Sequence, residues 1–221
     1  LDKVVDRIAE SGVEAVAVCL LHSYRNGDHE QCIGKAISAK LPNVIISLSS
    51  DVVPEFREYL RASTTVINSS VAPIVSTYLA SISEKLQEAK ITSELLVMQS
   101  NGGVYPAEAA SENPVFMVES GPAAGAVAAA SLGTALGHPN VISFDMGGTT
   151  AKESLIRNGK PNITKDYSVG GAAQSGTGAF GGASGYPIRT PVVDLVEIGA
   201  GGGSIAWVDS GGALRVGPQS A

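Results

Sequence analysis

A strand, a double-glycine turn and a second strand form the most constraining feature of this 221-residue chain. The apolar run Val141–Asp145 leads into Gly147-Gly148, and after Thr149-Thr150 a second strand follows at Ala151–Ile156. Consecutive glycines let backbone N–H groups approach an anion closely, and the threonines add hydroxyl donors. Because no Gly-Lys-Ser/Thr sequence and no helix follows, the turn is neither a P-loop nor a dinucleotide-binding motif. The pattern predicts a β-hairpin that binds phosphate, with a plain tight hairpin as the alternative.

Asp145 stands at the end of the first of these strands, which we expect to be buried. A carboxylate does not bind phosphate directly, so we expect Asp145 to be catalytic and to hold a metal. It would coordinate a hydrated Mg²⁺ or orient a water molecule near the terminal phosphate of a nucleotide. The phosphate-binding residues predicted in this turn are Gly147, Gly148, Thr149 and Thr150.

A second glycine turn lies at Gly199–Gly203, between two further predicted strands. Two interpretations of it are equally supported by the sequence. It contacts the nucleotide or a facing domain, or it is a sharp turn with no ligand. The residues assigned to nucleotide binding in the first interpretation are Gly201, Gly202 and Gly203.

Helices and strands alternate along the first part of the chain. Apolar periodicity predicts helices at 1–11 and 28–40, and continuous apolar runs predict buried strands at 13–21 and 44–48. This alternation indicates an α/β fold. The same reasoning predicts the following further elements: helices at 68–89, 107–111 and 122–136, strands at 94–99 and 115–119, and a hairpin formed by 204–209 and 213–216.

The composition changes in the last quarter of the chain, where 14 of the 26 glycines lie between residues 170 and 217. The stretch 170–185 has too little apolar surface to fold alone, so we expect a mobile loop there. Upstream, Glu119 precedes a predicted helix N-terminus, which favours a plain helix cap over an anion site. Lys152 is interpreted either as a phosphate partner or as an exposed strand residue. For Glu197 we favour a solvated strand position over a role in acid–base catalysis.

Charge and composition exclude several classes of function. The chain has 15 basic and 21 acidic residues, a formal charge of −6, and no basic patch, so nucleic-acid binding is disfavoured. No apolar run reaches the roughly 18 residues that span a membrane. Cys19 and Cys32 lack metal-ligand spacing, which favours two reduced thiols in a cytoplasmic protein over a disulfide or a catalytic cysteine. The three histidines lack ligand spacing too, and of these His22 is the candidate to test.

Several motifs, in order, resemble the A subunit of the hydantoinase/oxoprolinase family. They include the glycine turn in Ser143–Thr150 and the second turn in Gly199–Asp209. The resemblance extends to the other motifs at Gly12–Tyr24, Ser49–Tyr59, Thr64–Asn68, Met98–Gly103 and Ser120–Ala123, and so covers essentially the whole chain. It implies an actin-like, sugar-kinase-like ATPase fold. Residues 1–64 would be the end of the family's N-terminal domain, and residues 65–221 the first part of the hydantoinase A domain.

The resemblance also implies a chemistry. Members of the family use ATP and Mg²⁺ to activate a cyclic amide for ring opening, and many work with a B-type subunit or domain. A ketone carboxylase subunit and a nucleotide-binding module without turnover are the alternatives, and assembly of identical copies stays open. The family's earlier Asp-x-Gly-Gly-Thr turn is absent, so we expect an inactive internal fragment with a fold that is incomplete at both ends. Lys152 replaces the aspartate of many members, which favours the hydantoinase-like branch.

Overall fold

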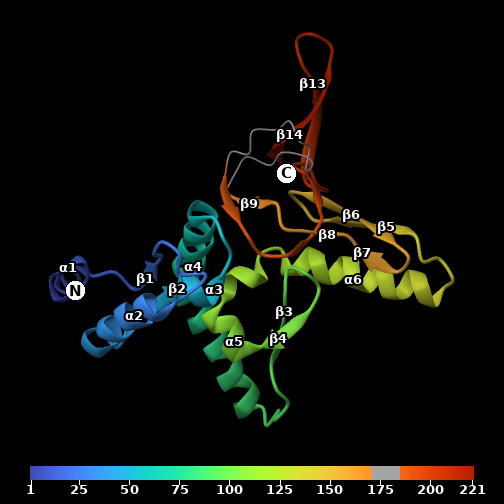
Figure 1. Cartoon of the computed structure of the whole chain (residues 1–221). Helices are drawn as coiled ribbons and strands as arrows, with labels where there is room; N and C mark the ends of the chain where they lie inside the picture. Colours follow the sequence, from blue (N-terminus) through green and yellow to red (C-terminus); the bar gives the residue numbers. More distant parts are fainter. Residues whose placement is uncertain (171–184) are drawn as a thin grey trace. The chain divides into compact units, whose positions relative to one another are not determined.

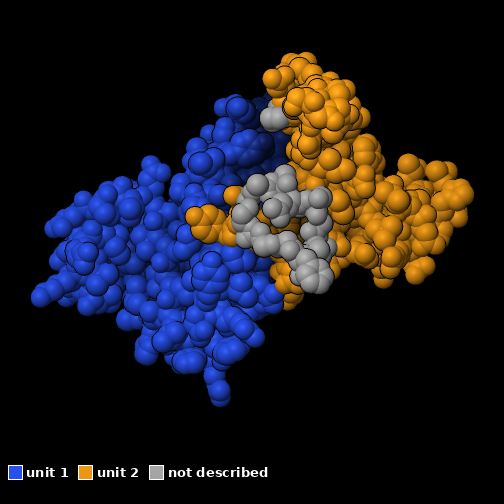
Figure 2. All heavy atoms as spheres, turned by 90° about the horizontal axis from the view of Figure 1, so that it is seen from above, with its two compact units in different colours: residues 1–99, 103–118, 187–190 blue, residues 100–102, 119–186, 191–221 orange. Residues whose placement is uncertain are grey.

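The computed structural model describes residues 1–170 and 185–221. Contacts divide them into two compact units, coloured separately in Figure 2. Unit 1 is 1–99, 103–118 and 187–190, and unit 2 is 100–102, 119–186 and 191–221. These units do not test the predicted family domains at 1–64 and 65–221, which stay predictions. The predicted mobile loop at 170–185 lies almost entirely outside the described residues.

Unit 1 begins with the predicted alternation of helices and strands (Figure 1). Its first elements are α1 (Asp2–Ser11), β1 (Ala15–Val18), α2 (Asp28–Lys40) and β2 (Ile45–Leu48). Gly12 ends α1 with φ 66°, a conformation that glycine adopts at little cost. The two strands pair in parallel, with Val16 opposite Ile46. Each element contributes one side chain to the apolar core: Val5, Val18, Ile37 and Leu48.

The long helix α4 (Glu58–Glu88) follows the short α3 (Ser49–Val52) and packs on both strands of unit 1. It starts ten residues before the predicted start at 68. The first turns contain the β-branched run Thr64–Ile67, which lowers helix propensity, and tertiary contacts override that preference. Asn68 shows why, because its fully buried amide donates to Ser47 Oγ at 3.0 Å and accepts from Val115 N at 3.1 Å.

By length and composition α4 could cross a membrane, with an 18-residue window of mean hydropathy 1.2. One such helix is weak evidence, because core helices of soluble proteins pass the same test. Polar side chains are buried along α4, including Arg61, Thr64 and Asn68. Contacts with β1, β2 and α5 (Ala107–Glu112) make α4 the central helix of unit 1. The expected lack of a membrane partner stays a prediction.

The rest of unit 1 contains one clear departure from prediction. Strands β3 (Leu96–Met98) and β4 (Val104–Pro106) form an antiparallel pair before α5. The predicted strand at 115–119 is wrong, because Pro114–Met117 is a 3-10 helix. Proline fixes φ near −65° and suits the first turn of a helix, so the apolar residues after it continue that turn.

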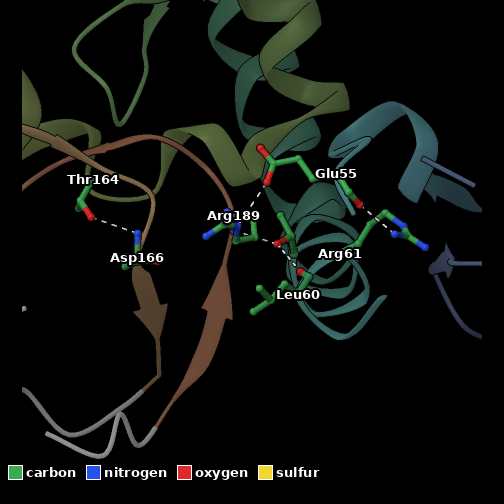
Figure 3. A network of polar contacts seen from close by, with 7 residues as sticks. Glu55, Leu60, Arg61, Thr164, Asp166 and Arg189 are labelled. Atoms are coloured by element: carbon green, nitrogen blue, oxygen red, sulfur yellow. Dashed lines mark hydrogen bonds and ion pairs between the residues drawn. The ribbon is translucent and has the colours of Figure 1, made fainter. Parts of the chain in front are cut away.

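Residues 187–190 return to unit 1 from far along the chain and attach to the start of α4. The backbone N–H of Arg189 donates to Thr64 Oγ1 at 3.0 Å, and Arg189 Nε lies 3.3 Å from Glu55 Oε2. Figure 3 shows Arg189 and Glu55 side by side. Thr190 is fully buried, so the segment is part of the folded unit.

Unit 2 is built on helix α6 (Ser120–Ala135) and a small antiparallel sheet. The strand order is β12-β6-β5, and β7 pairs with β6. The bounds are β5 (Val141–Met146), β6 (Ala151–Arg157), β7 (Lys160–Pro161) and β12 (Val196–Ile198). Shorter strands are β9 (Tyr167–Val169) and β8 (Ile163–Thr164), of which β8 pairs with β11 (Val192–Val193). Strand β10 (Tyr186–Ile188) begins in unit 2 at Tyr186, and its last two residues belong to the 187–190 segment of unit 1. The predicted last hairpin is confirmed as β13 (Ser204–Val208) and β14 (Leu214–Ser220).

The sheet of unit 2 has one face against α6 and one open apolar face. Val141 and Ser154 belong to the α6 face, since Gly133 of α6 lies close against Val141 and Ser154 is buried in register with Ser143. The opposite face exposes apolar side chains at Ile142, Phe144, Met146, Leu155, Val196 and Ile198. The expectation that the strand before the glycine turn is buried is therefore wrong. Among the described residues β5 is an edge strand, because β6 is the one described strand that pairs with it.

Candidate phosphate-binding site

The predicted hairpin forms at the Asp145–Thr150 turn. Strands β5 and β6 pair in register up to Met146 opposite Ala151, and the N–H of Gly147 donates to Thr150 O at 3.0 Å. This bond closes a tight turn at the end of an antiparallel ladder. The sequence thus located the turn and both strands correctly.

The backbone of this turn is open to the outside. Gly147, Gly148 and Thr149 are exposed, and neither glycine has a positive φ. A Cβ at Gly148 would meet nothing within 4 Å, and one at Gly147 would meet only Thr150 O at 3.9 Å. Packing within the described chain therefore does not require glycine here. Glycine instead leaves room for an outside group to reach the main chain.

Unused donors surround that open backbone. Across residues 1–170 and 185–221, no hydrogen bond involves the amides of Gly148, Thr149 and Thr150 or the two threonine hydroxyls. Backbone N–H groups gathered in one turn form a concave anion site. The geometry therefore suits a phosphate at the residues predicted to bind it, and their contact with phosphate stays a prediction.

The second glycine turn, Gly199–Gly203, is hydrogen-bonded to the backbone of the first. The N–H groups of Gly202 and Gly203 donate to the carbonyls of Gly147 and Gly148, at 2.9 and 2.8 Å. A Cβ on Gly201 would lie 2.5 Å from Gly147 O, so only glycine permits this approach of two backbones.

All three predicted nucleotide-binding amides of this turn are thus occupied within the chain, since the N–H of Gly201 donates to Ser204 Oγ at 2.9 Å. The arrangement favours the interpretation of a structural turn. Contact of Gly201, Gly202 or Gly203 with a nucleotide stays a prediction.

Asp145 lies beside an open cavity of about 220 Å³ at the edge of β5. Its side chain is exposed, and within the described part of the chain its carboxylate makes no hydrogen bond or ion pair. Ser143 and Lys152 line the same cavity, with Pro122 and Gly125 of α6 opposite. A free carboxylate beside unused amide donors is a suitable environment for a cation that accompanies phosphate.

The donor set fits Mg²⁺ better than a metal held by protein alone. No group of three His, Cys, Asp or Glu side chains that could hold an ion occurs in the described ranges. Mg²⁺ commonly keeps several waters and binds through one or two carboxylates and the substrate's phosphates. One free carboxylate at Asp145 satisfies that pattern, and His22 and His29 are exposed and do not add to it.

An ionic cluster stands next to Asp145 on the α6 face of the sheet. We call it the Lys152 cluster; its members are Glu119, Lys152, Tyr167 and Glu197. Lys152 Nζ contacts the Glu119 carboxylate and lies 3.7 Å from Glu197 Oε1. Burial raises the pKa of the Tyr167 hydroxyl, and the charge and hydrogen bond of Glu119 raise it further. Lys152 is therefore not simply an exposed strand residue, and Glu197 is not simply solvated, because the two side chains belong to one ionic cluster.

Glu119 also departs from its predicted role. It precedes α6 with φ 62°, a conformation that is unfavourable for a residue with a Cβ. Its side chain makes no capping bond, and its carbonyl accepts from Ala123 N at 3.1 Å. The carboxylate is directed to Lys152 instead, so the sequence found the helix start but missed the partner.

Unit 1 holds a second polar network, which the sequence did not reveal. We call it the Glu30 network; its members are Ser23, Glu30, Ser49 and Arg61, all buried. Glu30 accepts from Leu20 N and Ser49 Oγ, each at 2.7 Å, and from Ser50 N at 2.8 Å. Burial by itself would raise the pKa of Glu30. The hydrogen bonds outweigh burial, so the pKa of Glu30 is lowered.

Arg61 completes the Glu30 network. Its Nε donates to Ser49 Oγ at 3.1 Å, and its two terminal nitrogens donate to Glu55 O and Leu20 O. The guanidinium also lies 5.7 Å from the ring centre of Tyr24. The available sequence signal was the position of Glu30 on the same face of α2 as Ile37, a charged residue within a buried stripe.

Comparisons with known proteins show the family and the fold of the chain. The family model "Hydantoinase/oxoprolinase" matches residues 61–221, and the model of that family's N-terminal region matches residues 1–41. The chain is 46% identical over its whole length to an uncharacterized protein of Methanocaldococcus jannaschii, of which it covers 32%. It is 36% identical to caprolactamase subunit alpha of Pseudomonas jessenii, over 98% of this chain and 29% of that protein. It is 32% identical to 5-oxoprolinase of Saccharomyces cerevisiae, over 96% of this chain and 15% of that one.

Two solved structures show the same fold. The ATP-dependent caprolactamase of Pseudomonas jessenii matches with a TM-score of 0.77 and 32% identity, over 100% of this chain and 30% of its own. Nucleotide-free acetone carboxylase matches with a TM-score of 0.76 and 25% identity, over 99% and 29%. These matches confirm the predicted α/β, actin-like ATPase fold. The chain spans about a third or less of the length of these relatives.

Proposed function

The chain belongs to the hydantoinase/oxoprolinase family, and on that premise we propose that it is part of an ATP-dependent hydrolase that opens cyclic amides. The observation that carries the proposal is the open turn at Gly147–Thr150, with unused donors beside the free carboxylate of Asp145. Two relatives whose names denote lactam-opening enzymes, caprolactamase and 5-oxoprolinase, support the substrate class.

In this proposal each part of the turn has a separate task. The amides of Gly148, Thr149 and Thr150 bind the terminal phosphates of ATP, and Gly147 permits their close approach. Asp145 would hold Mg²⁺, which would neutralise phosphate charge, or would orient a water molecule at that phosphate. Gly201, Gly202 and Gly203 keep the turn in place, with nucleotide contact as their further predicted role. The protein thus contributes positioning and charge neutralisation.

ATP supplies the driving force by transferring its terminal phosphoryl group to the amide oxygen. That transfer makes the ring carbon more electrophilic, so water adds to the carbon and the C–N bond breaks. The balance is cyclic amide, ATP and water giving the open amino acid, ADP and phosphate. Relatives named as subunits support a B-type partner subunit or domain. A cytoplasmic location and an assembly of identical copies stay predictions.

One observation favours a second candidate function. The chain has 28% identity to the beta subunit of acetone carboxylase, and the acetone carboxylase structure shares its fold. In that alternative the same turn binds ATP, and the activated group is a ketone or bicarbonate. A nucleotide-binding module without turnover is the remaining alternative.

The test uses the full-length protein with its partner subunit. ATP hydrolysis is measured alone and with hydantoin, 5-oxoproline, caprolactam, or acetone with bicarbonate. Stimulation by a cyclic amide supports the proposal, stimulation by acetone and bicarbonate supports the carboxylase, and ATP binding without stimulated hydrolysis would reject both. Asp145→Asn should lower the stimulated rate at least 100-fold, about 2.7 kcal/mol of transition-state stabilisation. Glu153→Gln is the matched control, because Glu153 lies on the same sheet but on the other face.

A further inference from the structure

We propose that Lys152 is the positioning residue of the phosphate hairpin, acting through its ion pairs with Glu119 and Glu197. This inference rests on the proposed function, because it concerns the same turn. It adds a residue outside the turn to the machinery that determines nucleotide binding.

The position of Lys152 in the sheet is the first argument. It lies in the central strand β6, opposite Asp145 on β5 and opposite Glu197 on β12. Directly opposed residues of antiparallel strands have their Cβ atoms about 4.5–5.5 Å apart on one face. The three side chains therefore form a row of acid, base and acid across the sheet, two residues from the end of the glycine turn.

The partners of Lys152 are the second argument. Its ammonium contacts Glu119, just before α6, and lies 3.7 Å from Glu197. The side chains of Lys152 and Glu119 are only 16% and 20% exposed, so water screens their attraction poorly. One charge thereby joins β6, β12 and the start of α6, which contacts both strands of the hairpin.

Charge balance is the third argument. Without the ammonium, Glu119 and Glu197 would face each other near Asp145, and three carboxylates would share one side of the sheet. Like charges on one side of the sheet repel each other. Glu119 would also lose the ion pair that holds its left-handed backbone conformation. The hairpin would then shift relative to α6, and its amides would no longer converge on one phosphate.

A direct phosphate contact is not part of this proposal. The ammonium of Lys152 is already engaged by two carboxylates, whereas the neighbouring carboxylate of Asp145 has no partner among the described residues. Lys152 therefore acts through the hairpin and Asp145. Its replacement should raise the KM for ATP as well as lower kcat, and arginine should restore both.

The experiment compares Lys152→Met, Lys152→Arg and the double variant Glu119→Gln with Lys152→Met in the full-length protein. Lys160→Met is the control, since it removes the same charge from an exposed position on β7 of the same unit. Equilibrium binding of a non-hydrolysable ATP analogue is measured beside kcat and KM. We expect Lys152→Met to weaken binding about tenfold, equal to 1.4 kcal/mol, and Lys160→Met to leave it unchanged.

The double variant guards against a simple folding defect, because it removes the uncompensated Glu119 charge along with the ammonium. It should fold and bind the analogue more tightly than Lys152→Met. Unchanged binding in a folded Lys152→Met protein, or failure of Lys152→Arg to restore it, would overturn the proposal.

Hydrogen exchange of the peptide that covers 147–150 separates this inference from the proposed function. The Gly147 N–H is protected by its bond to Thr150, so a loosened hairpin exchanges faster. If the wild type binds no ATP, the proposed function fails, yet faster exchange in Lys152→Met still supports the positioning role. Equal exchange rates in wild type and variant would reject that role.

Discussion

The Glu30 network of unit 1 and the glycine turn of unit 2 use polar groups in opposite ways. In the network the buried carboxylate of Glu30 accepts three hydrogen bonds, and Arg61 donates from three nitrogens. At the turn, the amides of Gly148, Thr149 and Thr150 and the threonine hydroxyls lie open, and no described residue pairs with them. Satisfied buried groups specify a fold, whereas unsatisfied exposed donors beside a free carboxylate are available for a ligand.

This difference predicts whether a substitution changes folding or nucleotide binding. A change in the Glu30 network should alter folding with little direct effect on nucleotide. A change at the open side of the turn should alter nucleotide binding with little effect on folding. The second glycine turn lies between these limits, because its amides are satisfied and yet hold the open turn in place.

The largest effect is expected for Arg61→Met. Removing the guanidinium leaves three acceptors, Ser49 Oγ, Glu55 O and Leu20 O, without their donor, and each buried polar group left in this way costs about 1–3 kcal/mol. Urea denaturation of the full-length protein should show the loss in the free energy of unfolding. Arg25→Met is the control, because Arg25 is exposed, and a similar loss there would contradict the special role of Arg61.

Gly201→Ala should have the next largest effect. The added Cβ would lie 2.5 Å from Gly147 O, so the backbones of both turns must move apart. We expect a loss of about 1–3 kcal/mol in stability, as for overpacked sites, together with weaker ATP binding. Gly211→Ala adds the same methyl group at the exposed tip of the last hairpin, where its nearest contact is 3.4 Å. Equal effects of the two substitutions on denaturation would refute the contact between the turns.

Gly148→Ala isolates the open side of the turn. The φ of Gly148 is not positive, and nothing lies within 4 Å of the new methyl group. The free energy of unfolding should therefore change by less than about 0.5 kcal/mol. If phosphate approaches this backbone, the methyl group should weaken ATP binding about tenfold, or 1.4 kcal/mol. Isothermal titration with the non-hydrolysable analogue measures the binding. If Gly148→Ala binds the analogue with wild-type affinity, the phosphate does not approach this backbone, and the proposed difference between Gly148 and Gly201 is wrong.

The sequence predicted the local parts of this contrast and missed the long-range ones. The hairpin at Gly147-Gly148 follows from adjacent residues, and so do α1 and α2. The pairing of Glu119 with Lys152 joins residues 33 apart, and no local pattern determines it. The apolar run Val141–Asp145 correctly predicted a strand, but the burial of that strand depends on which layers cover it. Local preference also misplaced the start of α4, because buried contacts of Asn68 override weak helix formers.

The smallest effect concerns the pH dependence of the Glu30 network. Because the pKa of Glu30 is lowered in the folded state, its ionised form contributes stability that is fully present above the unfolded-state pKa. That contribution falls as the pH drops below 4.5, the ordinary pKa of a glutamate, and is lost on passing through the lowered pKa.

Glu30→Gln keeps the shape of the side chain and removes this proton linkage. Thermal unfolding between pH 3 and pH 6 should therefore depend on pH less steeply in Glu30→Gln than in the wild type. The exposed residue Glu10 provides the matched control Glu10→Gln, which should keep the wild-type slope. Identical slopes for all three proteins would show that the hydrogen bonds of Glu30 do not stabilise its charge, and the network could then no longer be treated as a fully satisfied counterpart of the open turn.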